Sequence, residues 1–223
     1  MLGRAPRPGQ AKTRLIPALG PRGAARAHAR LLTHVAGVTR AWCAAGPGRL
    51  FRLWCTPDLR HPLFRTLARP EELRVQSHGD LGRRLARVAE EGLVESRAVF
   101  LVGGDCVSLT ASLLDEALAM LERHPAVLAP AADGGYVLLG LTRLAKALFR
   151  DMPWGGPEVA AVTRERLRSL GWSWGELPVQ WDVDGPDDWA RFLRNVSRAT
   201  DSERAIPRET GGHDTEQDID FSG

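Results

Sequence analysis

The sequence predicts an α/β fold: a single domain with a mostly parallel sheet flanked by helices. The chain has 223 residues, 43% hydrophobic and 26% charged, which is enough for one sizeable globular domain. Short apolar runs alternate with segments of helical periodicity, the order typical of parallel sheets. The run Val99 to Val102 is bulky and uncharged throughout, as expected of a central strand covered on both faces.

The other elements follow the same alternation. The first strand is expected at 1–4 and is short, and a Pro/Gly loop over 5–14 comes after it. Residues 21–45 predict an amphipathic helix, which Gly46-Pro47-Gly48 ends. Further strands are expected at 50–55, 73–76, 98–102, 126–129, 136–141 and 172–177, and further helices at 80–95, 109–121, 157–170 and 186–196. We expect the 126–141 pair to be an irregular excursion from the sheet.

The chain divides into a domain and a tail. Residues 1–197 are expected to form one α/β domain, with a short first strand. Residues 198–223 are polar and carry few side chains able to join a core, so a disordered tail is expected.

Composition limits the compartment and the partners. No apolar run approaches the roughly 20 residues of a membrane helix, and the N-terminus lacks a signal-peptide core. The three cysteines are scattered without metal-ligand spacing, which fits a reducing cytosol. No basic run is interleaved with aromatic residues, so nucleic acid is not an expected partner. We therefore expect a cytoplasmic protein without a membrane partner, and the abundant arginine suits an anionic small ligand.

A carboxylate follows the central apolar run. Gly103, Gly104 and Asp105 come directly after the strand expected at 98–102. Ligands of open α/β sheets bind beyond the carboxyl ends of the strands, and glycines allow a ligand to approach closely. Asp105 is therefore a candidate for a metal or phosphate site. A helix cap or turn aspartate is the alternative.

Two other loops carry candidate phosphate-binding groups. Lys12 and Arg14 can donate to phosphate oxygens from the loop after the first strand, although this loop is not a Walker A sequence. A solvated basic loop is the alternative. Gly79, Asp80 and Gly82 precede or open the helix at 80–95, where free backbone N–H groups could bind an anion. Asp80 could equally be a simple cap.

The Asp133-Gly134-Gly135 turn lies between two apolar segments. It is either a plain hairpin turn or a place where Asp133 and the glycine backbone face a substrate. Trp154, before the helix at 157–170, could stack on a sugar or base, or could only pack against the start of that helix.

An acidic segment precedes the last helix. Asp187 and Asp188 suit the positive N-terminus of that helix. We expect Asp182 and Asp184 to point to alternate sides of an extended segment, so that at most one of them faces a given site. Together with Asp105 they would supply oxygen ligands for Mg²⁺ or Mn²⁺ bridging a substrate phosphate.

Taken in order, these motifs resemble a known bacterial family. The matching stretches run to about residue 196: Ala5-Pro-x-Pro-Gly9-x-x-Lys12-Thr-Arg-Leu15, Gly79-Asp-Leu-Gly82-x-Arg-Leu85, Gly104-Asp105-Cys-x-x-Leu109-Thr, Pro130-Ala-x-Asp-Gly-Gly-Tyr-Val-Leu-Leu-Gly140, Pro153-Trp-Gly155 and Asp182-Val-Asp184-x-Pro-x-Asp188. The family comprises glycosyltransferase-like proteins of the nucleotide-diphospho-sugar transferase (GT-A-like) superfamily, associated with arsenosugar or selenium radical-SAM gene clusters. The chain is more distantly similar to molybdenum-cofactor and 2-phospho-L-lactate guanylyltransferases.

The resemblance implies roles for these motifs. Lys12 and Arg14 would meet the diphosphate, and the turn from Gly79 to Gly82 would lie near the base. Asp105 would bind the metal, with Asp184 or Asp182 as a second carboxylate, and Asp133 with its glycines would face the sugar or acceptor. The chain departs from the family pattern in its short first strand, in Val107 where proline is usual and in Gly185 where threonine is usual.

The predicted function is metal-dependent glycosyl transfer from a nucleotide-sugar to a small-molecule acceptor. Asp105, Asp133 and Asp184 are the expected catalytic residues. Nucleotidyl transfer with release of pyrophosphate is an alternative. Asp105 lacks the neighbouring aspartate of an Asp-x-Asp motif, a pattern that the nucleotidyltransferases share. A non-catalytic nucleotide-binding domain is a third, suggested by the short first strand. The sequence does not indicate the base, the sugar, the acceptor, the anomeric outcome or the oligomeric state.

Overall fold

The computed structural model describes the backbone of residues 1–205 and the side chains of residues 1–196. The strands are β1 Leu2–Arg4, β2 Leu53–Thr56, β3 Leu73–Val75, β4 Val99–Val102, β5 Ala126–Pro130, β6 Tyr136–Leu141 and β7 Trp174–Glu176. The α-helices are α1 Ile16–Ala45, α2 Pro62–Leu67, α3 Leu81–Glu95, α4 Ala111–Leu121, α5 Val159–Ser169 and α6 Pro186–Ala205. The α/β fold with helices on both sides of the strands is as predicted.

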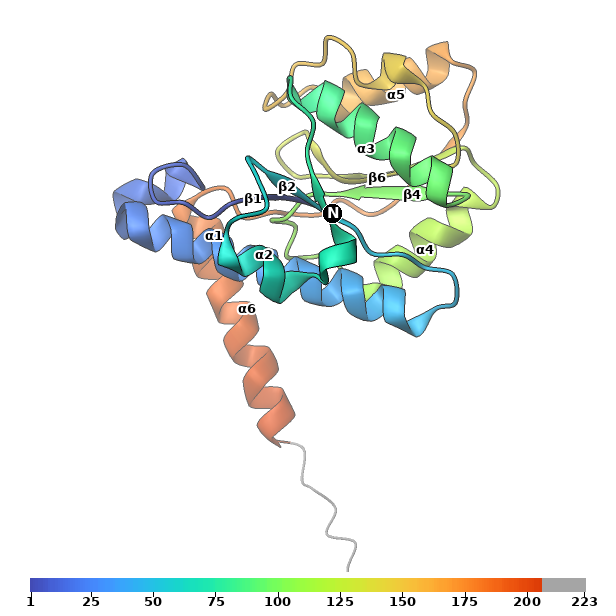
Figure 1. Ribbon diagram of the computed structural model, residues 1–223. Helices are drawn as coiled ribbons and strands as arrows, with labels where there is room; N and C mark the ends of the chain where they lie inside the picture. Colours follow the sequence, from blue (N-terminus) through green and yellow to red (C-terminus); the bar gives the residue numbers. More distant parts are fainter. Residues whose placement is uncertain (206–223) are drawn as a thin grey trace, which may run out of the picture.

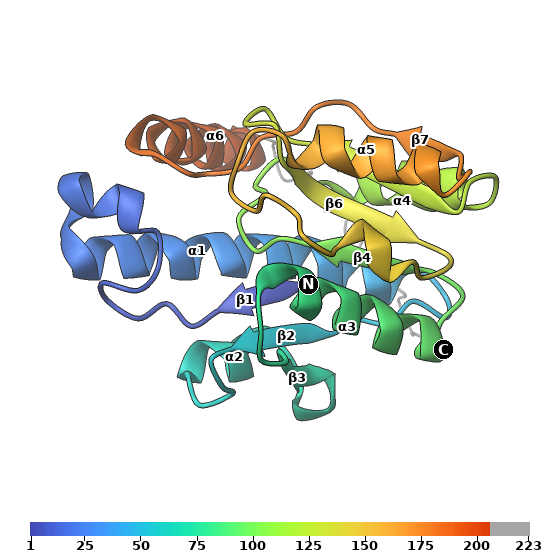
Figure 2. The same ribbon diagram turned by 90° about the horizontal axis from the view of Figure 1, so that it is seen from above.

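The strands form two hydrogen-bonded sheets that lie side by side. One is parallel, in the order β1-β2-β3, and the other has the order β4-β6-β5-β7. Figure 2 shows β1 next to β4, and a Cβ built on Gly104 would lie 3.0 Å from the carbonyl oxygen of Leu2. The carboxyl ends of β1, β2 and β4 therefore open onto one edge of the molecule.

The segment 126–141 differs from the prediction. Instead of an irregular excursion, β6 lies between β4 and β5, antiparallel to both. The expectation was wrong because the turn after β5 sends the chain straight back into the centre of the sheet. Burial agrees, since every residue of β5 and all but the first of β6 are buried.

Helices cover both faces of the strands. Figure 1 shows α3 and α5 on one side, and α1, α2 and α4 on the other. Neighbouring residues of one strand serve opposite cores: Leu138 packs toward the side of α1 and α4, and Leu139 toward the side of α3 and α5. Each such fully buried leucine contributes about 1.5–3 kcal/mol by removal of its side chain from water.

Helix boundaries depart from the prediction at three places. Helix α1 begins at Ile16 and is interrupted at Gly20, whose φ is 66°. Helix α2 was not predicted, because six residues are too few to show a helical period. Helix α6 continues to Ala205 instead of ending at 196, and the rest of the predicted tail, 206–223, lies outside the described residues. None of the described helices has the length and hydrophobicity required to cross a bilayer.

Candidate active site

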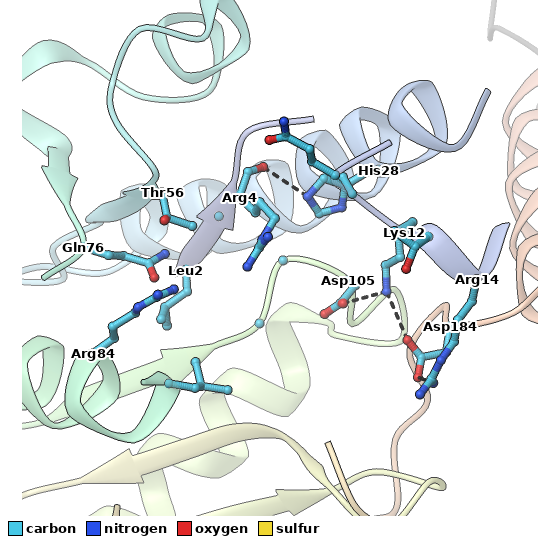
Figure 3. A pocket seen from close by; sticks show the side chains of 17 residues that line it. Leu2, Arg4, Lys12, Arg14, His28, Thr56, Gln76, Arg84, Asp105 and Asp184 are labelled. Atoms are coloured by element: carbon cyan, nitrogen blue, oxygen red, sulfur yellow. Dashed lines mark hydrogen bonds and ion pairs between the residues drawn. The ribbon is translucent and has the colours of Figure 1, made fainter. Parts of the chain in front are cut away.

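A cavity of about 470 Å³ lies at the carboxyl ends of β1, β2 and β4 (Figure 3). This is where open α/β sheets bind ligands. Its lining comes from the loop after β1, the ends of β2 and β3, the first turns of α3, and the loops after β4 and before α6: Leu2, Gly3, Arg4, Gln10, Ala11, Lys12, Thr13, Arg14, His28, Thr56, Gln76, Leu81, Arg84, Gly103, Gly104, Asp105 and Asp184.

Lys12 lies at the centre of the polar contacts in this cavity. Its backbone is left-handed, with φ 46°, just before the short 3₁₀ helix Thr13–Leu15. Its amine donates to Asp105 over 2.8 Å and to Asp184 over 3.4 Å, and its side chain is only 9% exposed. Burial lowers the pKa of Lys12, but the charges of Asp105, Asp184 and Asp182 outweigh burial, so the pKa is raised and the amine stays charged.

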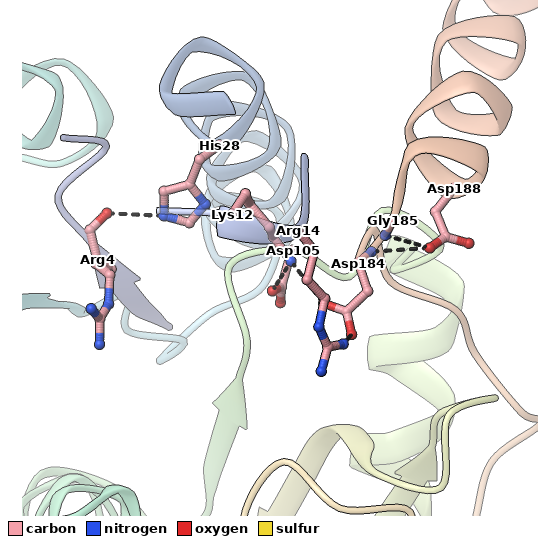
Figure 4. A network of polar contacts seen from close by, with 8 residues as sticks. All are labelled: Arg4, Lys12, Arg14, His28, Asp105, Asp184, Gly185 and Asp188. Atoms are coloured by element: carbon pink, nitrogen blue, oxygen red, sulfur yellow. Dashed lines mark hydrogen bonds and ion pairs between the residues drawn. The ribbon is translucent and has the colours of Figure 1, made fainter. Parts of the chain in front are cut away.

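Arg14 adds a second cation at the mouth of the cavity. Its guanidinium donates to Asp184 over 2.8 Å, and its side chain is 71% exposed. Both loop cations therefore point toward the acidic segment before α6, as Figure 4 shows. A diphosphate entering here would meet two donors that are already oriented.

Three carboxylates form a cluster beside these cations. Asp133, Asp182 and Asp184 each offer one oxygen, and these oxygens lie within 4.8 Å of one another. The predicted metal set contained Asp105 in place of Asp133, but Asp105 is hydrogen-bonded to Lys12. The structure thus groups Asp133 with the two later aspartates, and direct metal binding by Asp105 stays a prediction.

The expectation that Asp182 and Asp184 face different sides is wrong. Residues two positions apart share one side of an extended segment, and the residue between them faces the other. Val183 is fully buried against Leu31 and Phe192, so both aspartates are left on the open side.

Hydrogen bonds fix the segment that carries these aspartates. Ala132 N–H donates to the Gln180 carbonyl over 3.0 Å, and Val183 N–H donates to the Asp105 carbonyl over 3.4 Å. The segment therefore joins the β5–β6 turn to the loop after β4. At its end, Asp188 accepts from the N–H groups of Asp184 and Gly185, at 3.1 and 2.9 Å, as expected of a carboxylate at a helix N-terminus (Figure 4).

Asp182 has a raised pKa. Burial raises its pKa first, and the charges of Asp105, Asp184 and Asp133 raise it further, while Lys12 opposes them. The resulting pKa is about 7. The described cations therefore do not fully compensate the negative charge at this point, and a further cation would be stabilised here.

Several predicted site residues have packing roles. Asp80 caps α3 by accepting from Arg83 N–H over 2.8 Å. A Cβ on Gly82 would lie 2.1 Å from the Phe149 carbonyl oxygen, so glycine is required where α3 meets that loop. Gly79 adopts φ 115° in the turn before α3. These residues lie behind Leu81 and Arg84, which line the cavity instead; nucleotide contact by Gly79, Asp80 and Gly82 stays a prediction.

The predicted substrate residues lie around the β5–β6 turn. Gly135 N–H donates to Asp133 over 2.9 Å, which orients that carboxylate. Gly134 has φ 88°, and a Cβ there would lie 2.0 Å from the Pro157 carbonyl oxygen. Trp154 packs edge-on against Tyr136, with ring centroids 6.3 Å apart, and does not line the cavity. Contact of Gly134, Gly135 and Trp154 with a substrate stays a prediction.

Several residues that line the cavity are not among the predicted site residues. Arg4, Thr56 and Gln76 stand at or directly after the ends of β1, β2 and β3, so the rule that found Asp105 could have found them. His28 had no such signal. It is buried in α1, and its Nε2 donates to the Arg4 carbonyl over 3.1 Å, which leaves Nδ1 without a partner among the described residues. Burial lowers the pKa of His28 and favours this neutral form.

The comparisons with known proteins place the chain in a family. Residues 40–156, more than half of the chain, match a family described as "Uncharacterized protein conserved in bacteria (DUF2064)". The chain belongs to this family. It has no match among curated proteins.

One solved structure supports the fold. A "putative nucleotide-diphospho-sugar transferase" from Desulfovibrio desulfuricans G20 matches with a TM-score of 0.74 and 23% identity, over 90% of this chain and 95% of that one. At this identity the likeness establishes the fold. The Rv0371c homologue from Mycobacterium sp. strain JC1 matches at a TM-score of 0.49 and 19% identity, over 89% of this chain and 96% of its own.

Proposed function

We propose that this protein is a metal-dependent glycosyltransferase that moves a sugar from a nucleotide-sugar to a small-molecule acceptor. One observation carries the proposal: two loop cations, Lys12 and Arg14, line a cavity at the strand ends, and both pair there with Asp184, a member of the carboxylate cluster. A donor with an anionic diphosphate and a polar sugar suits this combination of charges. The likeness in fold to the Desulfovibrio protein supports the same reading.

The carboxylate cluster fits a hard divalent cation such as Mg²⁺ or Mn²⁺. Its ligand atoms are oxygens within 4.8 Å of one another, and the pKa of Asp182 is raised by burial and by the charges of the neighbouring aspartates. Asp133, Asp182 and Asp184 would hold the ion, with Asp105 beside them. When bound, it would neutralise charge on the departing diphosphate.

The chain's own residues would orient the donor. Lys12 and Arg14 would donate to the diphosphate oxygens, and their charge would stabilise the leaving group more than the intact donor. Asp105 would hold Lys12 in place through the contact already present. Asp133 is the exposed member of the cluster, and it would face the sugar or the acceptor hydroxyl.

Nucleotidyl transfer is the second candidate, and one observation favours it. Asp105 is the lone carboxylate at the end of β4, between Gly104 and Cys106. In that reaction Lys12 would meet the phosphates of a nucleoside triphosphate, and the acceptor would be a small phosphorylated molecule.

Product analysis tests the proposal. The full chain is incubated with Mn²⁺, a panel of nucleotide-sugars and a mixture of small hydroxylated acceptors. Release of nucleoside diphosphate with a glycosylated product supports glycosyl transfer. Release of pyrophosphate from a nucleoside triphosphate would assign nucleotidyl transfer instead. Nucleotide binding without turnover of any donor would leave a binding domain and contradict both enzymatic proposals.

A further inference from the structure

The cavity has two chemically different ends. One end holds Lys12, Asp105 and Asp184, as described above. At the other end, Gln76 and Arg84 turn toward one another beside Leu2 in Figure 3, and Leu81, 41% exposed, forms part of the wall. The second end combines an apolar wall with two side chains able to form directional hydrogen bonds, which is what recognition of a planar heterocycle requires.

Gln76 presents a hydrogen-bond acceptor to the cavity. Its backbone N–H donates to the Cys55 carbonyl over 2.9 Å, and its side-chain Nε2 donates to the Trp54 carbonyl over 2.8 Å. These two bonds fix the side chain on the end of β2 and settle which way the amide faces. Its Oε1 accepts no hydrogen bond from the described residues, so the free group is an acceptor.

Arg84 presents donors. Its Nε donates to the Gly79 carbonyl over 2.9 Å, which anchors the guanidinium to the turn before α3. Within the described part of the chain, no carboxylate pairs with Arg84, and its terminal nitrogens bond no protein acceptor. The unpaired guanidinium of Arg84 and the free Oε1 of Gln76 together offer a ligand one defined pattern of hydrogen-bond donors and acceptor.

We infer that this end of the cavity selects a nucleotide base with a lactam edge, guanine or uracil, over adenine and cytosine. The inference rests on the proposed function, which places the diphosphate at Lys12. Arg84 would donate to the base carbonyl oxygen, and Gln76 Oε1 would accept from the adjacent ring N–H. Adenine and cytosine reverse this pattern, since an unprotonated ring nitrogen would face Oε1 and an amino group would face the guanidinium. Polar groups that a mismatched base leaves unpaired make a hydrogen-bonding site discriminate between bases.

The alternative is that Arg84 contacts a phosphate group instead of the base, and this alternative predicts a different pattern of affinities. A phosphate contact adds the same affinity to every nucleotide, whereas a base contact adds affinity only for matching bases.

Calorimetric titration of the full chain with GDP, UDP, ADP and CDP at fixed Mn²⁺ tests the inference. We expect GDP, UDP or both to bind about tenfold or more tightly than ADP and CDP, as the loss of one hydrogen bond near a charge predicts. Diphosphates of 1-methylguanosine and 3-methyluridine, which lack the lactam N–H, should fall to the level of ADP. These ligands test Gln76 on the unaltered protein.

Arg84→Met supplies the second measurement, with Arg83→Met as its control. Arg83 stands next to it on α3, is 80% exposed and does not line the cavity. Arg84→Met should remove the preference for GDP or UDP and leave ADP binding unchanged, and Arg83→Met should keep the preference. Equal binding of all four diphosphates, or an equal loss for all four in Arg84→Met, would overturn the inference and leave the proposed function standing. Failure of all four to bind would overturn both.

Discussion

The amine of Lys12 lies 2.8 Å from a carboxylate oxygen of Asp105, although the two residues are 93 positions apart. This contact joins the loop after β1 to the end of β4. It also places the most buried cation of the cavity among carboxylates that would otherwise repel one another. The position of the loop after β1 and the charge balance of the acidic cluster therefore depend on the same pair.

Lys12→Ala should weaken nucleotide binding by about 1.5–3 kcal/mol, the usual contribution of a hydrogen bond to a charged group. Calorimetric titration with a nucleoside diphosphate measures this loss. Arg7→Ala is the matched control, because Arg7 is on the same loop and pairs with Asp58 outside the cavity. Equal affinity in Lys12→Ala and wild type would remove this loop from the site.

Asp184→Asn should abolish most turnover, because asparagine keeps an oxygen ligand but loses the charge that holds the cation. Chelation by EDTA should abolish turnover of the wild type, and Mg²⁺ or Mn²⁺ should restore it. Asp187→Asn should have little effect, since Asp187 lies in the first turn of α6 and outside the cluster. Full activity of Asp184→Asn in EDTA would exclude the metal mechanism.

Asp182 should make the metal-free protein less stable as the pH rises. Its pKa is about 7 in the fold and 3.8 in the free residue, so between these values the unfolded chain binds fewer protons than the folded one. Stability therefore falls as the pH rises through this window. In EDTA, Asp182→Asn should melt at a higher temperature than wild type at pH 8, with a smaller difference at pH 5. An equal difference at both pH values would contradict this origin of the effect.

Gly134→Ala should destabilise the fold more than Gly155→Ala. Both glycines have positive φ, 88° and 82°, so each substitution incurs the same backbone penalty of about 1–2 kcal/mol. A Cβ at Gly134 would also lie 2.0 Å from the Pro157 carbonyl oxygen, whereas nothing lies within 4 Å at Gly155. The excess should be about 1–3 kcal/mol in urea denaturation, and equal losses would show that the contact relaxes freely.

Strand ends were the most informative feature of the sequence. An apolar run followed by glycines located Asp105 correctly at the edge of the sheet, because burial and chain reversal are both visible in residue types. The place of β6 was not visible in this way. Residue types show that a segment is a buried strand, but not which strands it pairs with.

The same limit explains why the grouping of Asp133 with Asp182 and Asp184 was not predicted. Asp133 joins Asp182 because the β5–β6 turn pairs with the segment at Gln180, a contact between residues far apart in sequence. The local sequence did show that Asp182 and Asp184 share one side of the segment. Their separation of two residues, with an apolar valine between them, places both on one side of an extended segment. The expectation of opposite sides holds for adjacent residues and not for residues two positions apart.

Register decides whether this centre exists at all. Gln180 pairs with Ala131, and from that pairing onward Val183 turns inward while its two acidic neighbours turn outward. Shifting an extended segment by one residue exchanges its two sides. One residue inserted between Leu177 and Gln180 would thus move Val183 into the place of Asp184 at the cavity and force the Asp182 carboxylate against Leu31 and Phe192. The cluster therefore depends on the number of residues between Leu177 and Asp182 as much as on the aspartates themselves.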